Sequence, residues 1–133
     1  MHIKGWDYLQ EYEDEKEEIL CAIEEVLASG YLILGDKVKK FEDLYSSYCG
    51  VDFGVGVDNG TNAIFLALKA LNIGESDEVV TVSNTAVATV SAIVTAGARP
   101  VFVDINESSF LMDTTKIENA INSKTKCIPG GVS

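Results

Sequence analysis

Two N-terminal segments carry apolar residues at helical spacing. The first segment predicts a helix over residues 10–28, and the second predicts a helix that ends near Gly50. The short apolar run between Gly30 and Gly35 predicts a loop or a short extended piece. The apolar positions that carry the two helices are Ile19, Ala22, Ile23, Val26 and Leu27, followed by Val38, Phe41, Leu44 and Tyr45.

After Gly50 the pattern changes to short apolar runs that alternate with helical segments. Thr115 and Glu118 have the spacing of a capping box at the start of the last of these helices. Because the strands are apolar on both faces, the sequence predicts a three-layer α/β fold, with a mainly parallel sheet and helices on both faces. The predicted strands are 53–57, 78–82, 100–103 and 125–128, and the predicted helices are 61–71, 86–96 and 115–121.

The negative charge of the chain is concentrated near its N-terminus. The 133 residues have a net charge of −11, and the segment 11–25 holds eight acidic residues and one Lys. We interpret this segment as the solvated face of a helix, which repels nucleic acid and anionic membranes. No apolar run has the length of a membrane span, so we expect no nucleic-acid or membrane partner and a cytoplasmic location.

Cysteine and histidine are too few and too scattered for a disulfide framework, a zinc site or a catalytic triad. Cys21, Cys49 and Cys127 form no CxxC pair, and the one histidine is His2. We therefore expect no metal ion, and we interpret Cys21 and Cys127 as buried structural thiols.

The segment 54–63 is the first candidate for chemistry. It predicts a strand, a glycine-containing turn and the start of a helix. Free amides at a helix start bind anions, so Gly60, Thr61 and Asn62 are the candidate residues for a phosphate group. The residues leave an alternative open, in which Asn59 or Thr61 only caps the helix. The glycine order matches neither the dinucleotide-binding fingerprint nor the P-loop.

Two further strands end in polar residues. Ser83, Asn84 and Thr85 follow the strand at 78–82, and another strand ends at Asp104. Ligands of open α/β sheets bind at the carboxyl ends of the strands, so these residues are candidate ligand contacts. The alternative is structural: one of the first three caps the following helix, and Asp104 caps the next turn.

Several segments in this order resemble the DegT/DnrJ-type nucleotide-sugar aminotransferases over nearly the whole chain. Each segment alone has low specificity, whereas the ordered series at the family's spacing is specific. The segments are Trp6-Asp7-Tyr8-Leu9, Ser29 to Gly35, Phe41-Glu42, Gly60-Thr61-Asn62-Ala63, Asp77-Glu78-Val79, Asn84-Thr85, Ala96 to Asp104 and Lys124-Thr125-Lys126.

The resemblance implies part of the large domain of a fold-type I aminotransferase, which binds pyridoxal 5'-phosphate (PLP) and works as a homodimer. Gly60, Thr61 and Asn62 would hold the PLP phosphate. Ala86 stands where many family members carry an aromatic residue that stacks on the cofactor ring. The resemblance also implies the transfer of an amino group from glutamate to a nucleotide-linked keto sugar, with PLP as the electron sink.

The chain departs from the family pattern at its C-terminal end. After Pro129 the family continues with Val-His-Leu-Tyr-Gly, whereas this chain reads Gly-Gly-Val-Ser. No Lys or Arg matches the family's Schiff-base lysine, so we expect an N-terminal fragment that has no catalytic residue and no activity of its own. The expected organisation is an N-terminal helix and loop at 1–36, a partial PLP-binding large domain at 37–129, and a non-native or truncated end at 130–133.

Two other hypotheses remain open. The alternation of strands and helices also fits a dinucleotide-binding Rossmann domain of an oxidoreductase, which would bind NAD. A non-catalytic relative that acts as an interaction protein would keep the fold without the lysine.

Overall fold

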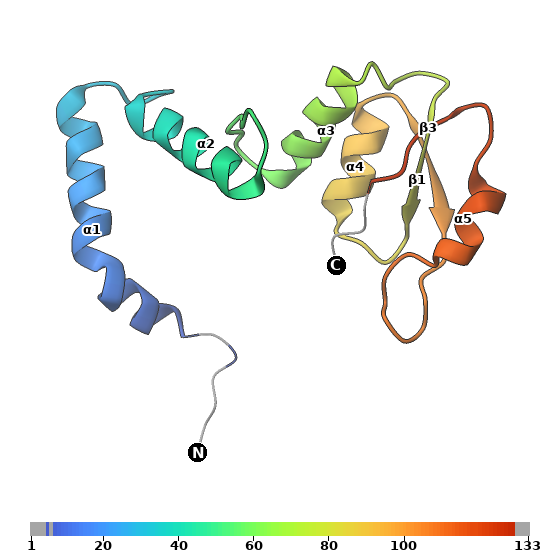
Figure 1. Cartoon of the computed structure of the whole chain (residues 1–133), viewed down its shortest axis with the longest axis horizontal. Helices are drawn as coiled ribbons and strands as arrows, with labels where there is room; N and C mark the ends of the chain where they lie inside the picture. Colours follow the sequence, from blue (N-terminus) through green and yellow to red (C-terminus); the bar gives the residue numbers. More distant parts are fainter. Residues whose placement is uncertain (1–4, 6, 130–133) are drawn as a thin grey trace. The chain divides into compact units, whose positions relative to one another are not determined.

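The computed structural model describes Gly5 and residues 7–129 (Figure 1). Trp6 and residues 130–133, on which parts of the sequence analysis rest, lie outside the described residues. The chain forms two compact units, of which one ends at Gly56 and the other begins at Val57. The domain boundary expected after residue 36 stays a prediction.

The first unit contains the two helices that the apolar spacing predicts. They are α1 (Tyr8–Ser29) and α2 (Asp36–Cys49). Both helices end at a glycine in the left-handed conformation, since φ is 72° at Gly30 and 69° at Gly50. Glycine adopts this conformation without a Cβ clash, which explains why the helices end at these positions. Among the described residues, no helix is both long and apolar enough to cross a membrane.

The strand predicted at residues 53–57 is wrong. This segment is irregular and pairs with no strand among the described residues. Instead, the backbone N–H of Gly56 donates to Oε1 of Glu42 over 2.7 Å. A Cβ atom at Gly54 would lie 3.0 Å from the carbonyl oxygen of Glu42. The two glycines therefore let the segment lie close to α2, and its backbone binds a side chain of that helix rather than a sheet.

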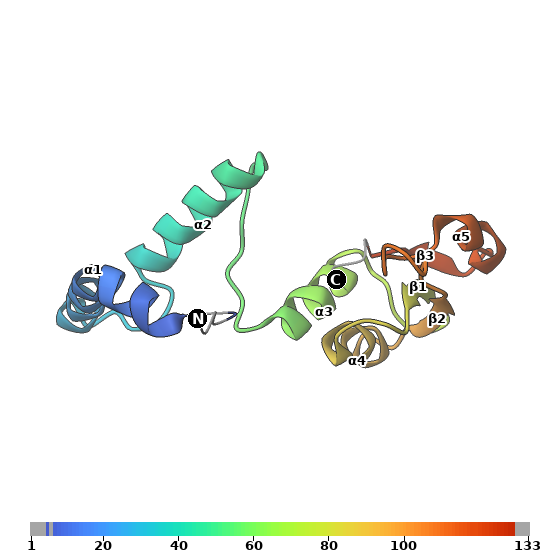
Figure 2. The same ribbon diagram turned by 90° about the horizontal axis from the view of Figure 1, so that it is seen from below.

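The second unit has the predicted α/β architecture. Its elements are α3 (Gly60–Ala70), β1 (Glu78–Val82), α4 (Val87–Thr95), β2 (Arg99–Val103), α5 (Thr114–Ala120) and β3 (Thr125–Cys127). Strand β1 lies between β2 and β3, and both neighbours are parallel to it. All five residues of β1 are buried, as expected for a central strand that is covered on both faces. Figure 2 shows α4 and α5 on opposite sides of the sheet.

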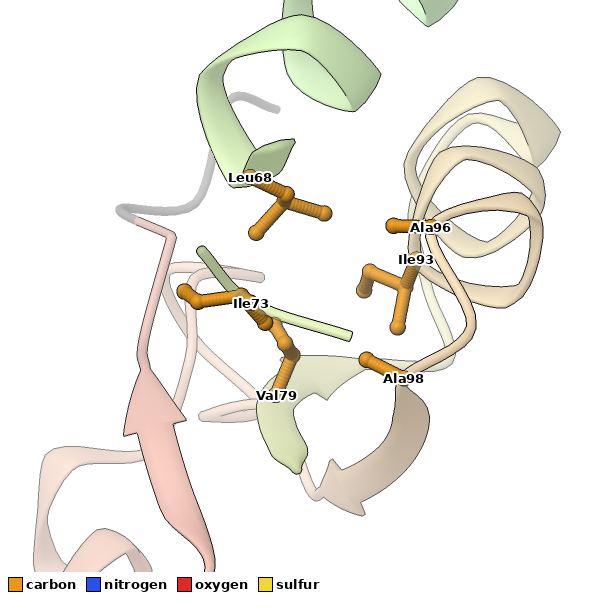
Figure 3. Close-up of a cluster of buried hydrophobic side chains, with 6 residues drawn as sticks. All are labelled: Leu68, Ile73, Val79, Ile93, Ala96 and Ala98. Carbon is orange, nitrogen blue, oxygen red and sulfur yellow. The ribbon is translucent and has the colours of Figure 1, made fainter. Parts of the chain in front are cut away.

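One apolar cluster holds α3 and α4 against the sheet. Leu68 comes from α3, Ile93 from α4 and Val79 from β1, and their side chains point toward one another (Figure 3). Val79 and Ile93 are fully buried, with 0% of their surface exposed. The cluster consists of Leu68, Ile73, Val79, Ile93, Ala96 and Ala98.

A buried carboxylate joins the starts of the strands. Glu78, the first residue of β1, accepts a hydrogen bond from Arg99 at the start of β2 over 2.5 Å. Its other oxygen accepts from Nδ2 of Asn122, just before β3, over 2.8 Å. The Arg99 guanidinium and the Asn122 amide hold the pKa of Glu78 below its usual value. Hydrogen bonds to the charged form stabilise it, so this carboxylate is ionised in the folded chain at neutral pH.

Helix α5 begins one residue before its predicted start and has a different cap. The predicted capping box of Thr115 and Glu118 is wrong, because the N-cap is Asp113. Its Oδ1 accepts from the backbone N–H of Thr115 over 3.0 Å and from the Thr115 hydroxyl over 2.6 Å. Aspartate is a strong N-cap, and Thr115 serves as its donor rather than as the cap itself.

Candidate functional site

The candidate phosphate turn begins with an asparagine that caps α3. Asn59 has an extended backbone, with φ −162° and ψ 168°, and its side-chain oxygen accepts from the backbone N–H of Asn62 over 2.9 Å. The carbonyl of Asn59 accepts from the N–H of Ala63 over 3.0 Å. The cap predicted as the structural alternative is therefore present at Asn59, and it uses only one of the free amides of the helix start.

The backbone amides of Gly60 and Thr61 are the open donors of this turn. Amides in the first turn of a helix have no carbonyl partner within the helix, and these two meet no acceptor among the described residues. A Cβ atom built on Gly60 would meet no atom of the described residues within 4 Å, and φ there lies outside the left-handed region. Neither the packing of these residues nor the conformation requires a glycine at this position. The turn thus offers an anion two amides and open space.

Asn62 does not present a free side chain to this space. Its Nδ2 donates to both carboxylate oxygens of Asp58, over 2.8 Å and 3.0 Å. Nδ2 of Asn59 also donates to Asp58, over 3.0 Å. Asp58 was not among the residues predicted from the sequence, because it precedes the helix and no motif marks it.

The second candidate segment leads into α4 without a side-chain cap. The N-cap is Ala86, so the predicted cap by Ser83, Asn84 or Thr85 is wrong. The hydroxyl of Thr85 instead lies 3.1 Å from that of Thr89. Ala86 is exposed, and its methyl group offers a small apolar contact at the start of the helix.

Both turns face the edge of the sheet at which the strands end. Helices α3 and α4 pack side by side and run against the direction of β1 and β2 (Figure 1). Near their C-terminal ends, Nζ of Lys69 donates to the carbonyl of Ala96 over 2.9 Å. Because the helices share this orientation, the free amides at both helix starts lie toward the carboxyl edge, where ligands of such sheets bind.

The third candidate, Asp104, is engaged in an ion pair. Its Oδ2 lies 3.3 Å from Nζ of Lys116, which also lies 3.6 Å from Oδ2 of Asp113. The hydrogen bond to Asp104 raises the pKa of Lys116, and the hydrogen bonds from Thr115 lower the pKa of Asp113. The predicted cap of the next turn by Asp104 is wrong, because the side-chain oxygen of Asn106 accepts from the backbone N–H groups of Ser108 and Ser109 in that turn.

The cysteines are not a reactive cluster. Cys21 is exposed, so its predicted burial is wrong, and Cys49 is exposed as well. Cys127 is half-buried against the apolar cluster, and its burial raises the pKa of the thiol. Cys127 therefore stays protonated at neutral pH, as expected for an unreactive structural thiol.

Known proteins match this chain over most of its length. A dTDP-3-amino-3,4,6-trideoxy-alpha-D-glucose transaminase from Micromonospora megalomicea subsp. nigra is 55% identical over 123 residues, which are 92% of this chain and 33% of that protein. The chain thus spans about a third of the length of that relative.

Solved structures agree with this match. The structure of DesV from S. venezuelae, in complex with a ketimine intermediate, has a TM-score of 0.89 and 38% identity over 92% of this chain and 33% of that one. The structure of ntda from Bacillus subtilis, with the bound cofactor PMP, has a TM-score of 0.83 and 38% identity over 86% of this chain and 26% of that one.

The family assignment rests on a match to the sequence model of a whole family. The sequence model of one family covers residues 13–129, which include most of α1, all of α2 and the described second unit from Val57. This chain belongs to the DegT/DnrJ/EryC1/StrS aminotransferase family.

Proposed function

We propose that the whole protein is a PLP-dependent aminotransferase that transfers the amino group of glutamate to a nucleotide-linked keto sugar. The observation that carries the proposal is the pair of open amides at Gly60 and Thr61, in a chain that belongs to an aminotransferase family. The similar Micromonospora protein is named as a transaminase of a dTDP-linked 3-amino sugar. This name favours a keto group at position 3 of a dTDP-linked sugar as the acceptor.

The residues of the turn fit the phosphate group of PLP. The amides of Gly60 and Thr61 and the Thr61 hydroxyl are the proposed phosphate donors. Asn62 contributes indirectly, since its backbone N–H closes the cap and its side chain binds Asp58. Ala86 is the proposed apolar contact for the cofactor ring, without the stacking that an aromatic side chain would add. When bound, PLP supplies the electron sink for the transfer.

We further infer that this chain alone does not catalyse the transfer. Three of its lysines have other partners: Lys37 pairs with Glu25, Lys69 binds a backbone carbonyl, and Lys116 pairs with Asp104. No Lys or Arg of this chain matches the family's position for the lysine that forms the Schiff base with the cofactor. That lysine, the small domain and a homodimer partner are proposed for the whole protein.

An assay of the whole protein tests the function. Incubation with PLP, glutamate and a dTDP-linked 3-keto sugar should release 2-oxoglutarate and give the amino sugar. NAD-dependent oxidation of a sugar would instead support the oxidoreductase hypothesis, and the absence of any turnover would support the interaction protein. For this chain alone, borohydride reduction with PLP should label no single lysine selectively; selective labelling would contradict the inferred lack of activity.

A further inference from the structure

Asp58 lies directly before the proposed cofactor turn and is not among the residues proposed to contact PLP. Its exposed carboxylate accepts hydrogen bonds from two asparagine side chains. Nδ2 of Asn62 lies 2.8 Å from one oxygen and 3.0 Å from the other, and Nδ2 of Asn59 lies 3.0 Å from the second oxygen. One carboxylate therefore fixes two amide side chains of the turn.

The carboxylate also decides which end of the Asn59 amide faces the helix. Because the nitrogen of Asn59 donates to Asp58, its oxygen points the other way and accepts from the backbone N–H of Asn62 over 2.9 Å. A reversed amide would place NH₂ against this N–H, so that two donors would face each other and the cap would be lost. Asp58 thus favours the side-chain orientation in which Asn59 caps α3.

Whereas the hydrogen bonds of Asp58 order the turn, its negative charge repels a bound phosphate. Like charges repel, but the repulsion between solvent-exposed charges is weakened by water and by salt. Loss of an N-cap lowers the equilibrium constant for forming the helix start by about threefold to tenfold. The usual effect of one solvent-exposed charge is smaller. The ordering of the turn therefore outweighs the repulsion.

We propose that Asp58 is a positioning residue of the cofactor turn, which acts through Asn59 and Asn62 to keep the amides of Gly60 and Thr61 in place for a phosphate group. This inference rests on the proposed function, because the role of the ordered turn is to hold PLP. It assigns a cofactor-related role to a residue that does not touch the cofactor.

The test compares Asp58→Ala, Asp58→Asn and Asp52→Ala in this chain, with pyridoxal phosphate and inorganic phosphate as separate probes. Asp52 is exposed, and its replacement removes the same charge outside the turn. The NMR shifts of the Gly60 and Thr61 backbone amides give the affinity for each probe. The side-chain amide resonances of Asn59 and Asn62 report on the contacts with Asp58 without any ligand.

Asp58→Ala should weaken the binding of pyridoxal phosphate by about threefold to tenfold relative to Asp52→Ala. It should also move the side-chain resonances of Asn59 and Asn62 toward those of free amides. Asp58→Asn keeps one accepting oxygen, so its affinity should lie between those of Asp58→Ala and the unsubstituted chain.

Binding by Asp58→Ala that equals or exceeds that of Asp52→Ala would overturn the proposal and leave Asp58 as a repelling charge. If Asp58→Ala does not fold, the affinity of Asp58→Asn is compared with that of Asp52→Ala instead. An equal or higher affinity of Asp58→Asn would overturn the proposal. A lack of phosphate binding by the unsubstituted chain would overturn the proposed cofactor turn itself, whereas binding that is insensitive to position 58 would overturn only the role of Asp58.

Discussion

The side-chain oxygen of Asn59 accepts a hydrogen bond from the backbone N–H of Asn62 over 2.9 Å, and this contact closes the first turn of α3. Asn59→Ala removes the acceptor and should lower the free energy of unfolding by about 1 kcal/mol. Asn59→Ser, which restores a capping oxygen, should recover most of the loss. Urea denaturation of the three chains measures the effect, and equal stability of the alanine and serine variants would show that the cap contributes nothing.

Glu78 should contribute to the stability of the second unit at neutral pH. Glu78→Gln removes the charge that Arg99 and Asn122 bind and turns an NH₂ group toward one of these donors. The urea midpoint should therefore fall. Glu75→Gln is the matched control, because Glu75 is exposed and its replacement should leave the midpoint unchanged.

The contribution of Glu78 should depend on pH. The pKa of Glu78 is lowered in the folded chain, mainly by the hydrogen bonds from Arg99 and Asn122. A carboxyl group of this kind stabilises the fold above its unfolded pKa, and the stabilisation is lost as the pH falls through the lower, folded pKa. The stability difference between the unsubstituted chain and Glu78→Gln should thus be largest at neutral pH and shrink in acid. A difference that is constant with pH would contradict this account.

Two neighbouring residues of α4 should differ sharply in their tolerance of substitution. Ile93 is fully buried in the cluster of Figure 3, whereas Val94 is 57% exposed. Ile93→Ala should cost about 2–5 kcal/mol of unfolding free energy, because it removes buried methyl groups and leaves a cavity. Val94→Ala should change stability by about 0.5 kcal/mol or less. Similar losses for both variants would mean that the cluster is not the core of this unit.

The apolar pattern predicted most of the second unit because its central apolar residues are buried there. The buried strand β1, for example, spans the predicted residues 78–82. The segment 53–57 has the same apolar appearance but is no strand, because strand formation also needs a hydrogen-bond partner. The backbone N–H of Gly56 instead donates to the side chain of Glu42, 14 residues earlier in the chain, and the sequence pattern does not show such a contact.

The candidate site could be placed from the sequence more readily than its hydrogen bonds. A glycine at the start of a predicted helix singled out Gly60 and Thr61, although the strand predicted before them is absent. The hydrogen-bond partners of the polar side chains depend on which groups of the turn compete for them. Asp58 accepts from the Asn62 side chain, and Asn59 accepts from the backbone N–H of Asn62. Several neighbouring residues have the chemistry to cap a helix, so the geometry of the folded turn decides which of them does.

Gly60→Ala separates ligand access from stability. A Cβ atom at this position would meet no atom within 4 Å in the part of the chain that the structure describes, and alanine favours the helical conformation more than glycine does. The variant should therefore be at least as stable as the unsubstituted chain. The added methyl group would occupy part of the open space at Gly60 and should weaken the binding of pyridoxal phosphate. Thr61→Ala should weaken binding as well, because it removes the proposed hydroxyl donor. Urea denaturation and ligand titration of both variants measure the two effects.

An NMR titration of the backbone amides of this chain with pyridoxal phosphate tests the proposed phosphate site directly. The largest shifts should occur at Gly60 and Thr61, and Gly60→Ala should reduce the affinity without loss of stability. Largest shifts at other residues, or unchanged affinity in Gly60→Ala, would contradict the assignment of this turn as the phosphate site.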